Sequence, residues 1–585
     1  MPGDAVNRST QNSNRIRYLL FAALGAVALA VGITWAFSLR WVNDDAFISF
    51  RYAKNFADGL GLVYNAGERV EGYTNFLWTV LIAAGMKLGI DPVVFSTALG
   101  ILCYSFTLLI FISLSRVFQR ESPLPFLIPL TALGLSLHRD FNVYATGGLE
   151  TSFFTFLVAL SFLFLVRGKS RNSLLMAGSV LSLIMMTRAD GAVFLIGAAV
   201  FVFLSHRERV KSCLYLLAPV VLFFGPYWMW RYEYYGFPFP NTYYAKSAYL
   251  PYYSQGIKYI VLYWKTYYVF TLLPILILLA LKKERSGGGI LDGFRSFRTA
   301  EGFDSPIART SLLATIYCCL WMLYVARTGG DFMFARFLVP ITPFFYCLCE
   351  ILLTRYFRKV PFLTLAFVLL LATFLRFDQY TRLPQRDGIT DEWQYYPRAY
   401  HERAQKTGTV LRKYVHELPI KIAFGGMMAQ VIYYAEPPVA IEGVTGLTDT
   451  LIAHQQIFSR GRPGHEKAVP TDYLIRRKVN FLAWIDNAPF DKDRVNQISF
   501  DGIQLLILVY ENGVMEQLTH FPEVQFVRAP QFIDSCIAGL DTLPRNQVVT
   551  GYAFLKTYYF DPNDDRTREQ MFLSHMRGVS VESAR

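Results

Sequence analysis

The chain has 585 residues, of which 53% are hydrophobic, 16% aromatic and only 17% charged. This composition is too apolar for a soluble protein, and the apolar runs are too many for a single membrane anchor. The net charge of +13 would suit a nucleic-acid partner, but the basic residues stand mainly in short loops between apolar runs. The positive-inside rule accounts for them, so we expect a polytopic α-helical membrane protein without a nucleic-acid partner.

Apolar runs long enough to cross a bilayer, about 20 residues each, recur from Tyr18 to about Arg376 and then stop. The opening run from Tyr18 to Leu39 lacks a cleavage pattern of small residues and is interpreted as a retained helix. The run from Phe76 to Ile90 is short and carries Lys87, so we interpret it as an interfacial or re-entrant helix. Roughly eleven crossings remain when one counts about 20 residues for each.

Clusters of Lys and Arg mark the turns that we expect to face the cytoplasm. They are Arg8, Arg15 and Arg17 near the N-terminus, and Arg116, Arg167, Arg207, Lys282 and Arg355 with their neighbours. The N-terminus is therefore predicted to be cytoplasmic. The intervening loops and the tail are predicted to lie outside, in the periplasm or its equivalent.

The loss of long apolar runs divides the chain into a transmembrane catalytic domain, residues 1–376, and an exported tail, residues 377–585. The tail is long enough to form a domain. Residues 420–424 and 502–510 have the pattern of strands, and residues 400–416 that of a helix. We expect the tail to be an α/β or mixed domain.

An acidic pair, Asp44 and Asp45, follows the first apolar run at the start of a short amphipathic stretch. The outward loops together carry carboxylates, cations and hydroxyl-binding side chains, which are the groups needed for sugar transfer from a lipid phosphate. In that reaction the acceptor hydroxyl must lose its proton as it attacks, and a carboxylate beside it can act as general base. Either Asp44 or Asp45 is the candidate base. The alternative is that the pair only caps the helix that begins near Ala46.

A departing polyprenyl phosphate carries negative charge, which arginine stabilises by bidentate hydrogen bonds and lysine as a point charge. The candidates in the outward loops are Arg51, Arg188, Lys246 and Arg336. Two of them have an alternative interpretation. Arg188 could pair with Asp190, and Arg336 could end a helix by snorkelling at the interface.

Side chains that can bind hydroxyl groups are expected to contact the sugar and its acceptor. They are Glu68, Glu71, Tyr73, Asn75, His138, Glu150, Asp190, Asn241, Asp331, His454 and His465. Glu68, Glu71 and Asp331 could instead form salt bridges. His138 could be a partner within its own loop, and the two tail histidines could order the tail.

The sequence contains no nucleotide-binding loop and no dinucleotide glycine fingerprint, so the energy for transfer must arrive in the substrate. We expect no cofactor. A divalent cation bridging the donor phosphate is the alternative, because hard cations prefer oxygen ligands. Adjacent Asp44 and Asp45 are poorly placed to hold one ion together, and Arg188 with Lys246 would neutralise the phosphate without it.

Three strings are specific enough to indicate a family. They are Asp44-Asp45-Ala46-Phe47-Ile48-Ser49-Phe50-Arg51-Tyr52, Glu68-Arg69-Val70-Glu71-Gly72-Tyr73-Thr74-Asn75, and Gly329-Gly330-Asp331-Phe332-Met333 with Arg336. They resemble the terminal arabinofuranosyltransferases of mycobacterial cell walls, in the GT-C superfamily of polyprenyl-phosphate-dependent glycosyltransferases. In the tail, the likeness continues in Gly446-Leu447-Thr448-Asp449 and Gly464-His465-Glu466-Lys467.

The resemblance implies a GT-C-like fold in a bacterial plasma membrane and an inverting transferase with its catalytic aspartate on the first outward loop. It also implies a polyprenyl-phosphate-linked sugar as donor and a cell-envelope glycan or lipid as acceptor. The sugar stays open between arabinofuranose and related sugars.

Two other classes of function compete with transfer. A transporter or flippase of polyprenyl-linked sugars would carry its functional charges at mid-membrane, often at broken helices, whereas here they gather in outward loops. A scaffold that only binds glycan would tolerate replacement of Asp44 and Asp45.

Overall fold

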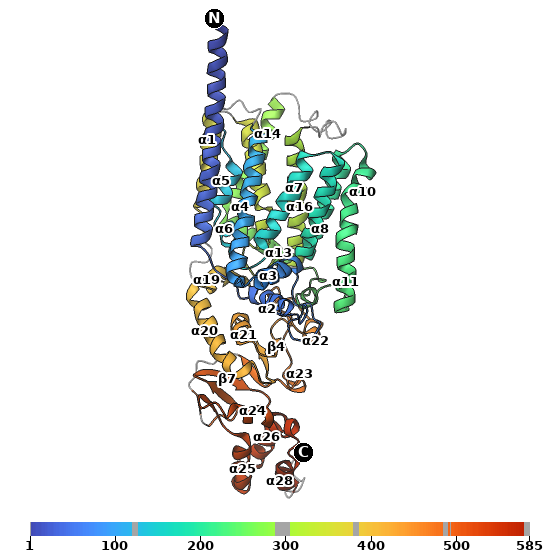
Figure 1. The fold of residues 1–585 in the computed structure, drawn as a ribbon, viewed down its shortest axis with the longest axis vertical. Helices are drawn as coiled ribbons and strands as arrows, with labels where there is room; N and C mark the ends of the chain where they lie inside the picture. Colours follow the sequence, from blue (N-terminus) through green and yellow to red (C-terminus); the bar gives the residue numbers. More distant parts are fainter. Residues whose placement is uncertain are drawn as a thin grey trace.

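The computed structural model describes residues 2–119, 127–286, 305–357, 359–377, 385–483, 490–491 and 493–577. A bundle of helices forms the first part of the chain (Figure 1). Its elements are α1 (Pro2–Ser38), α2 (Ala46–Ala57), α3 (Phe76–Lys87), α4 (Pro92–Phe118), α5 (Leu130–Ser136), α6 (Arg139–Val143), α7 (Thr151–Arg167), α8 (Arg171–Thr187), η1 (Ala189–Gly191), α9 (Ala192–Ser205), α10 (Arg209–Pro219), η2 (Val220–Phe224), α11 (Gly225–Tyr235), α12 (Asn241–Ala245), α13 (Tyr253–Thr266), η3 (Tyr268–Thr271), α14 (Leu272–Ser286), α16 (Pro306–Thr328), η5 (Val339–Ile341), α17 (Thr342–Tyr356) and α18 (Lys359–Phe374).

Several of these helices have the length and composition of membrane spans. Among the described residues, four helices pass on both counts: Arg15–Ser38, Pro92–Phe118, Arg209–Tyr235 and Pro306–Thr328. A fifth unit, Tyr253–Thr266 with Tyr268–Leu279, passes only as a pair that is bent by 96°. These helices support a multi-pass membrane protein. The predicted number of roughly eleven crossings, at about 20 residues each, stays a prediction.

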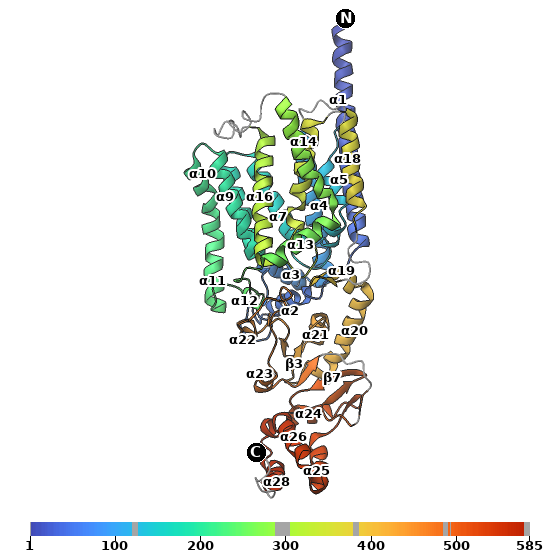
Figure 2. The ribbon, with the colours of Figure 1, turned by 180° about the vertical axis from the view of Figure 1, so that it is seen from behind.

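The basic turns and the tail lie at opposite ends of the bundle. Arg17 of α1 donates a hydrogen bond to the carbonyl oxygen of Gln119, just beyond α4 (3.1 Å). Arg309, near the start of α16, donates to the carbonyl oxygen of Leu165 near the end of α7 (2.6 Å). Figures 1 and 2 show that α1 projects from this end, while the tail covers the other. This is the separation that the charge pattern predicts.

The segment that we interpreted as interfacial forms a helix too short to cross a bilayer. Helix α3 has 12 residues. At about 1.5 Å per residue it is about 18 Å long, whereas the hydrocarbon core is about 30 Å thick. It packs against α2 at the end of the bundle that faces the tail (Figure 1). This length agrees with the exclusion of residues 76–90 from the full spans, which stays a prediction.

The tail is built around a mixed sheet. Its elements are β1 (Gln385–Arg386), β2 (Ile389–Thr390), α19 (Glu392–Tyr395), α20 (Arg398–Val415), β3 (Lys421–Phe424), α21 (Ala429–Ala435), β4 (Val439–Glu442), α22 (Thr450–Ala453), α23 (Thr471–Arg476), β5 (Phe481–Ala483), β6 (Gln497–Phe500), β7 (Ile503–Ile507), α24 (Asn512–Leu518), β8 (Val524–Phe526), α25 (Ala529–Gly539), η6 (Leu540–Thr542), α26 (Arg545–Leu555), η7 (Lys556–Phe560), α27 (Asp561–Asn563) and α28 (Arg566–Arg577).

Six of the strands pair in the order β4-β3-β5-β7-β6-β8. Strands β4, β3 and β5 run parallel, and β5, β7, β6 and β8 pair antiparallel. The predicted strands over residues 420–424 and 502–510 correspond to β3 and β7, and the predicted helix over residues 400–416 to α20. These three predictions are confirmed.

The first loop, residues 39–75 between α1 and α3, is joined directly to the tail. Strand β4 lies at the edge of the sheet, and the Asn65 side chain pairs with its free edge. The Asn65 amide donates to the carbonyl oxygen of Ala440 (3.0 Å) and accepts from the amide of the same residue (2.9 Å). An open strand edge presents unpaired backbone groups, and this side chain satisfies two of them. The loop and the sheet therefore hold each other in register.

Candidate functional site

Three adjoining cavities lie where the loops of the bundle meet the tail; residues of the bundle alone line the first, and residues of both parts line the other two. The cationic chamber, of about 300 Å³, is lined by Thr74, Arg188, Asp190, Phe239, Tyr243, Lys246, Arg327, Arg336 and seven further residues. The tail chamber, of about 220 Å³, is lined by Asp44, Asp45, Phe332, Thr390, Glu392, Glu442, Arg462, His465 and others. The connecting cavity, of about 60 Å³, is lined by Asp45, Ser49, Tyr73, Asn75, Glu150, Lys246, Arg336 and others. The connecting cavity shares Lys246 and Arg336 with the first chamber and Asp45 with the second, so the three follow one another.

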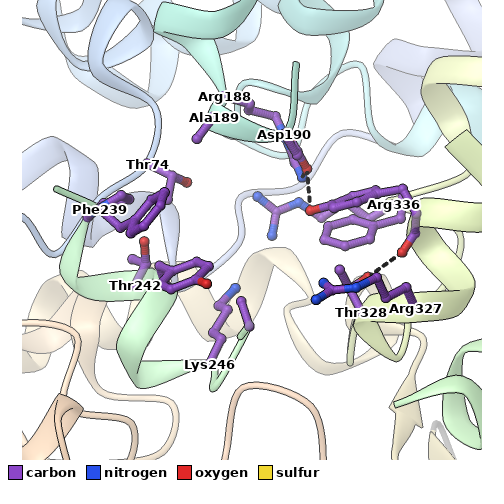
Figure 3. A pocket seen from close by; sticks show the side chains of 15 residues that line it. Thr74, Arg188, Ala189, Asp190, Phe239, Thr242, Lys246, Arg327, Thr328 and Arg336 are labelled. Atoms are coloured by element: carbon purple, nitrogen blue, oxygen red, sulfur yellow. Dashed lines mark hydrogen bonds and ion pairs between the residues drawn. The ribbon is translucent and has the colours of Figure 1, made fainter. Parts of the chain in front are cut away.

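Positive charge dominates the cationic chamber. Its lining includes Arg188, Lys246, Arg327 and Arg336 but only one carboxylate, that of Asp190. Figure 3 shows the head groups of Lys246, Arg327 and Arg336 converging on the cavity. Within the part of the chain that the structure describes, Lys246 and Arg327 have no ion-pair partner. An anion that entered this chamber would therefore meet unpaired cations.

Two of the arginines are held in place by carboxylates. Arg188 makes a bidentate contact with Asp190, with Nε–Oδ1 at 2.9 Å and Nη2–Oδ2 at 2.6 Å. The Oε1 atom of Glu150 accepts from Nη1 of Arg188 (3.1 Å) and from Nη2 of Arg336 (3.0 Å). The pairing of Arg188 with Asp190 matches the alternative that the sequence left open. It leaves Arg188 at the wall of the chamber.

Glu150 is the charge that the two guanidiniums share. It lies directly before α7 and is almost fully buried, at 1% exposure. Burial raises the pKa of its carboxyl, but the charges of Arg336 and Arg188 outweigh burial and lower that pKa to about 2. Glu150 is thus ionised at neutral pH and fixes the two arginines relative to each other.

The carboxylate of Asp45 has no partner among the described residues and lines two of the cavities. It occupies the position before α2, yet its side chain makes no capping hydrogen bond; its own amide donates to Oδ1 of Asn43 instead (2.8 Å). Among the described residues its carboxylate has no hydrogen-bond or ion-pair partner. It lines both the connecting cavity and the tail chamber. The capping interpretation is therefore wrong for the side chain of Asp45.

Asp44 has a different role, although it is adjacent in sequence. Its Oδ2 and Oδ1 atoms accept the backbone amides of Ala429 and Gln430, both at 3.0 Å, at the start of α21 in the tail. The side chain is buried, and this burial raises the pKa of its carboxyl to about 7. Asp44 lines the tail chamber, but its two oxygens are occupied in joining the first loop to the tail.

The tail supplies polar residues that sequence reasoning missed. Glu392 is buried, and its Oε2 atom accepts from Nδ2 of Asn43 (3.4 Å). Burial and the negative charge of Asp45 raise the pKa of Glu392 to about 8. Arg462 donates to Oγ1 of Thr390 (3.0 Å). The only signal for Glu392 was its place in a polar string soon after the last apolar run, where the chain must still lie near the bundle.

The structure brings together ten of the residues that the sequence singled out. Those that line the three cavities are Asp44, Asp45, Tyr73, Asn75, Glu150, Arg188, Asp190, Lys246, Arg336 and His465. His465 packs against the ring of Phe332, with centroids 4.7 Å apart. Among the described residues, no group of three or more His, Cys, Asp and Glu side chains is placed to hold a metal ion.

Three other candidates join loops to the tail and line none of these cavities. Arg51 donates to the carbonyl oxygen of Pro437 (2.7 Å) and is buried, so it does not reach the cationic chamber. Glu68 forms an ion pair with Arg477. Asn241 donates to two carbonyl oxygens in the tail loop after β4, both at 2.9 Å. We correct the prediction for Arg51 from phosphate contact to attachment of the tail.

Two further candidates are used within the bundle. Glu71 forms a buried ion pair with Arg231 of α11 (2.6 Å). His138 is fully buried; its Nδ1 accepts from the amide of Phe141 (3.1 Å), and its Nε2 hydrogen-bonds with the hydroxyl of Tyr263 (2.9 Å). Neither residue lines a cavity, so the salt-bridge and loop-partner alternatives describe Glu71 and His138.

The remaining two candidates stand close to the site without lining it. Asp331 is buried, 3.5 Å from Nη1 of Arg336. His454 stacks on the ring of Tyr244, with centroids 4.1 Å apart, and orders the tail against α12. Asp331 therefore acts on the cationic chamber through Arg336.

No protein-family model matches the chain. Two curated relatives do, both named terminal beta-(1->2)-arabinofuranosyltransferase. The protein of Corynebacterium glutamicum is 28% identical over 375 residues, which are 58% of this chain and 51% of the relative. That of Mycobacterium tuberculosis is 26% identical over 356 residues, 57% of this chain and 56% of the relative. The chain thus spans about half the length of the curated relatives it matches.

Among solved structures, the chain is similar to two crystal structures of ArnT from Cupriavidus metallidurans. The one bound to undecaprenyl phosphate has a TM-score of 0.47 at 13% identity, covering 74% of this chain and 87% of that one. The apo structure has a TM-score of 0.42 at 14% identity, covering 78% and 90%. The sequence matches agree with the resemblance that the loop motifs indicate: over more than half its length, this chain is similar to two proteins named terminal beta-(1->2)-arabinofuranosyltransferase.

Proposed function

We propose that this chain is a membrane glycosyltransferase that transfers a sugar, arabinofuranose or a related one, from a polyprenyl phosphate to a cell-envelope glycan or lipid. The observation that carries the proposal is the position of Asp45. Its carboxylate, without a partner among the described residues, stands between a cationic chamber and a polar chamber of the tail. The curated relatives are named as transferases of arabinofuranose, which supports this class of sugar.

The cationic chamber suits the phosphate of the donor. Lys246 and Arg327 face it without ion-pair partners in the described ranges, and Nε of Arg336 is buried with no hydrogen-bond acceptor there. Charge-assisted hydrogen bonds to a phosphate are short and strong, and they strengthen as negative charge grows on the leaving oxygen. We assign these three side chains to the leaving phosphate and Arg188 to the wall that supports them.

Asp45 suits the general base. In the proposed step, an acceptor hydroxyl oxygen forms the new bond to the anomeric carbon, its proton passes to the Asp45 carboxylate, and the bond from that carbon to the phosphate oxygen breaks. The electron pair leaves with the phosphate. Asp45 lines the connecting cavity and the tail chamber, whereas the cations line the connecting cavity and the cationic chamber, so we assign attack and departure to opposite faces of the sugar. That arrangement inverts the anomeric configuration.

The acceptor would then lie in the tail chamber, beside Glu392, Arg462 and His465. The positions of the basic turns support an N-terminus in the cytoplasm and both chambers on the outer side of a bacterial plasma membrane. The energy for transfer is that of the sugar–phosphate bond. A cofactor is not part of the proposal.

The test is transfer of radiolabelled sugar by the purified protein in detergent, from a panel of polyprenyl-phosphate donors to crude cell-envelope glycan. Asp45→Asn is compared with Asp58→Asn, a control that replaces an exposed carboxylate at the other end of α2, outside the three cavities. Loss of a general base costs about 10²–10⁴-fold in rate, so Asp45→Asn is expected to fall by that factor. Asp58→Asn is expected to retain most of the activity.

Equal rates for the two variants would remove Asp45 from the mechanism. Absence of transfer by the wild type across the whole donor panel would favour the transporter interpretation. Movement of the same labelled lipid across proteoliposomes would then be the next measurement.

A further inference from the structure

Two apolar side chains of one short stretch of the tail are exposed to solvent, although Ile452 and Ala453 between them are buried. Residues 451–458 contain no Asp, Glu, Lys or Arg. Leu451 is 50% exposed and Phe458 is fully exposed. Isolated apolar residues on a surface need no explanation, but neighbouring ones that continue a lipid-facing surface indicate a contact site. Whether these side chains can contact lipid therefore depends on where the stretch lies relative to the candidate membrane spans.

The stretch lies beside the end of a candidate membrane span. The span Arg209–Tyr235 is only 22% buried within the protein. Its last turns expose Trp228, Met229 and Trp230, which is the aromatic pattern of a membrane interface. Directly beyond it, Phe237 and Phe239 are 37% and 48% exposed. The apolar surface thus continues past the end of the helix.

Contacts fix the tail stretch at this level. His454 stacks on Tyr244, with centroids 4.1 Å apart, and packs against Phe237 at 4.9 Å. Arg460, which follows the stretch, donates to the carbonyl oxygen of Leu250 (2.6 Å). Helix α22 contacts α12, and Figure 2 shows the two side by side; both views place α22 just beyond the end of α11 (Figures 1 and 2). Phe237, Phe239 and the tail stretch therefore lie together just beyond the end of the span.

We propose that Leu451–Phe458, with Phe237 and Phe239, forms a membrane lip that inserts into the bilayer on the tail side. The side chains of the lip contact the acyl chains of the lipids next to α11, as those of an interfacial segment do. The lip docks the tail on the membrane surface next to the cationic chamber, whose lining includes Phe239. The inference rests on the membrane span and not on sugar transfer, so either can fail without the other.

The test uses a polarity-sensitive fluorophore (NBD) on a single introduced cysteine, with the full chain in phosphatidylcholine nanodiscs. The partly or fully exposed cysteines Cys213, Cys319 and Cys536 are first replaced by serine. The probe is placed by Phe458→Cys and, as the matched control, by Leu543→Cys, a tail position that is 42% exposed. We expect the probe at 458 to emit at shorter wavelength than that at 543, and doxyl-labelled lipid to quench it several-fold more strongly.

Emission at 458 that matches that at 543, without quenching by doxyl lipid, would overturn the proposal. A shift at 458 that appears only after undecaprenyl phosphate is added would also overturn it, because the lip would then bind a polyprenyl chain and not the bilayer.

A second measurement needs no substitution. Hydroxyl-radical footprinting of the wild-type protein in nanodiscs compares Phe458 with Phe554, which is 41% exposed in the tail. By exposure within the protein, Phe458 should react faster. Membrane insertion reverses that order and makes Phe458 several-fold less reactive; an unreversed order contradicts the proposal.

Discussion

Glu150 holds two arginines of the cationic chamber, and Glu150→Gln tests how strongly. In the wild type, its Oε1 accepts from Arg188 and Arg336, and its Oε2 accepts from Nδ2 of Asn75 (3.0 Å). Glutamine keeps the shape of the side chain but removes the charge and replaces one acceptor by a donor. The two guanidiniums would then repel each other in a buried site without the carboxylate between them.

The magnitude follows from the pKa of Glu150. Burial raises this pKa, but Arg336 and Arg188 outweigh burial and lower it from 4.5 to about 2. At about 1.4 kcal/mol per pKa unit, the difference corresponds to roughly 3 kcal/mol of folding free energy. Because the folded-state pKa is the lower one, this stabilisation is present above pH 4.5. It is lost as the pH falls from 4.5 toward 2.

The assay is denaturant unfolding of the purified protein in one detergent, from pH 7 downward. We expect Glu150→Gln to be less stable than the wild type by roughly 3 kcal/mol at pH 7, with the gap closing below pH 4.5. The control is Glu68→Gln, whose ion pair with Arg477 is about one-third exposed and is expected to contribute less than about 1 kcal/mol. Equal stability of wild type and Glu150→Gln at pH 7, or a gap that does not change with pH, would refute the reasoning.

Three further predictions concern the chambers. Lys246→Ala should raise the KM for the lipid donor about 10- to 100-fold, through loss of one charge-assisted hydrogen bond, whereas Lys258→Ala on the exposed face of α13 should not. Burial raises the pKa of Glu392 to about 8, so folding favours the protonated carboxyl. The protonated carboxyl therefore stabilises the folded protein below pH 4.5, and this contribution is lost as the pH rises from 4.5 through 8. The thermal midpoint of the wild type should fall over that range, and that of Glu392→Gln should fall less. Transfer should persist in excess EDTA, and a loss that Mg²⁺ or Mn²⁺ restores would assign a divalent cation to the donor phosphate.

Much of the fold was predictable because it depends on local signals. Long apolar runs indicate helices, and the shortness of residues 76–90 separates α3 from the spans. The strands and the long helix of the tail follow from their own periodicity. The order of the sheet did not, since β5 pairs parallel with β3 and antiparallel with β7 across loops whose lengths carry no such information.

The candidate site was predictable where residues share one end of the bundle. Arg188, Lys246 and Arg336 lie far apart in sequence but stand in loops of the same side, and all three line one chamber. Arg51 stands on that side too, yet its guanidinium lies against the carbonyl oxygen of Pro437. Only the docking of the tail decides between these outcomes, and a contact between residues 386 positions apart leaves no local pattern.

The same docking explains why two adjacent aspartates differ. Asp44 faces the tail and receives two amides of α21, which fixes the first loop against the sheet. Asp45 is then held one residue away, at the junction of a chamber lined by four cations and a chamber lined by Glu392 and Glu442. In the proposed displacement at the anomeric carbon, the negatively charged phosphate leaves from one face of the sugar while the acceptor hydroxyl loses its proton on the other face. The concentration of cations in the cationic chamber, on one side of Asp45, separates the two, and the attachment of the tail through Asp44, Arg51 and Asn65 keeps them apart.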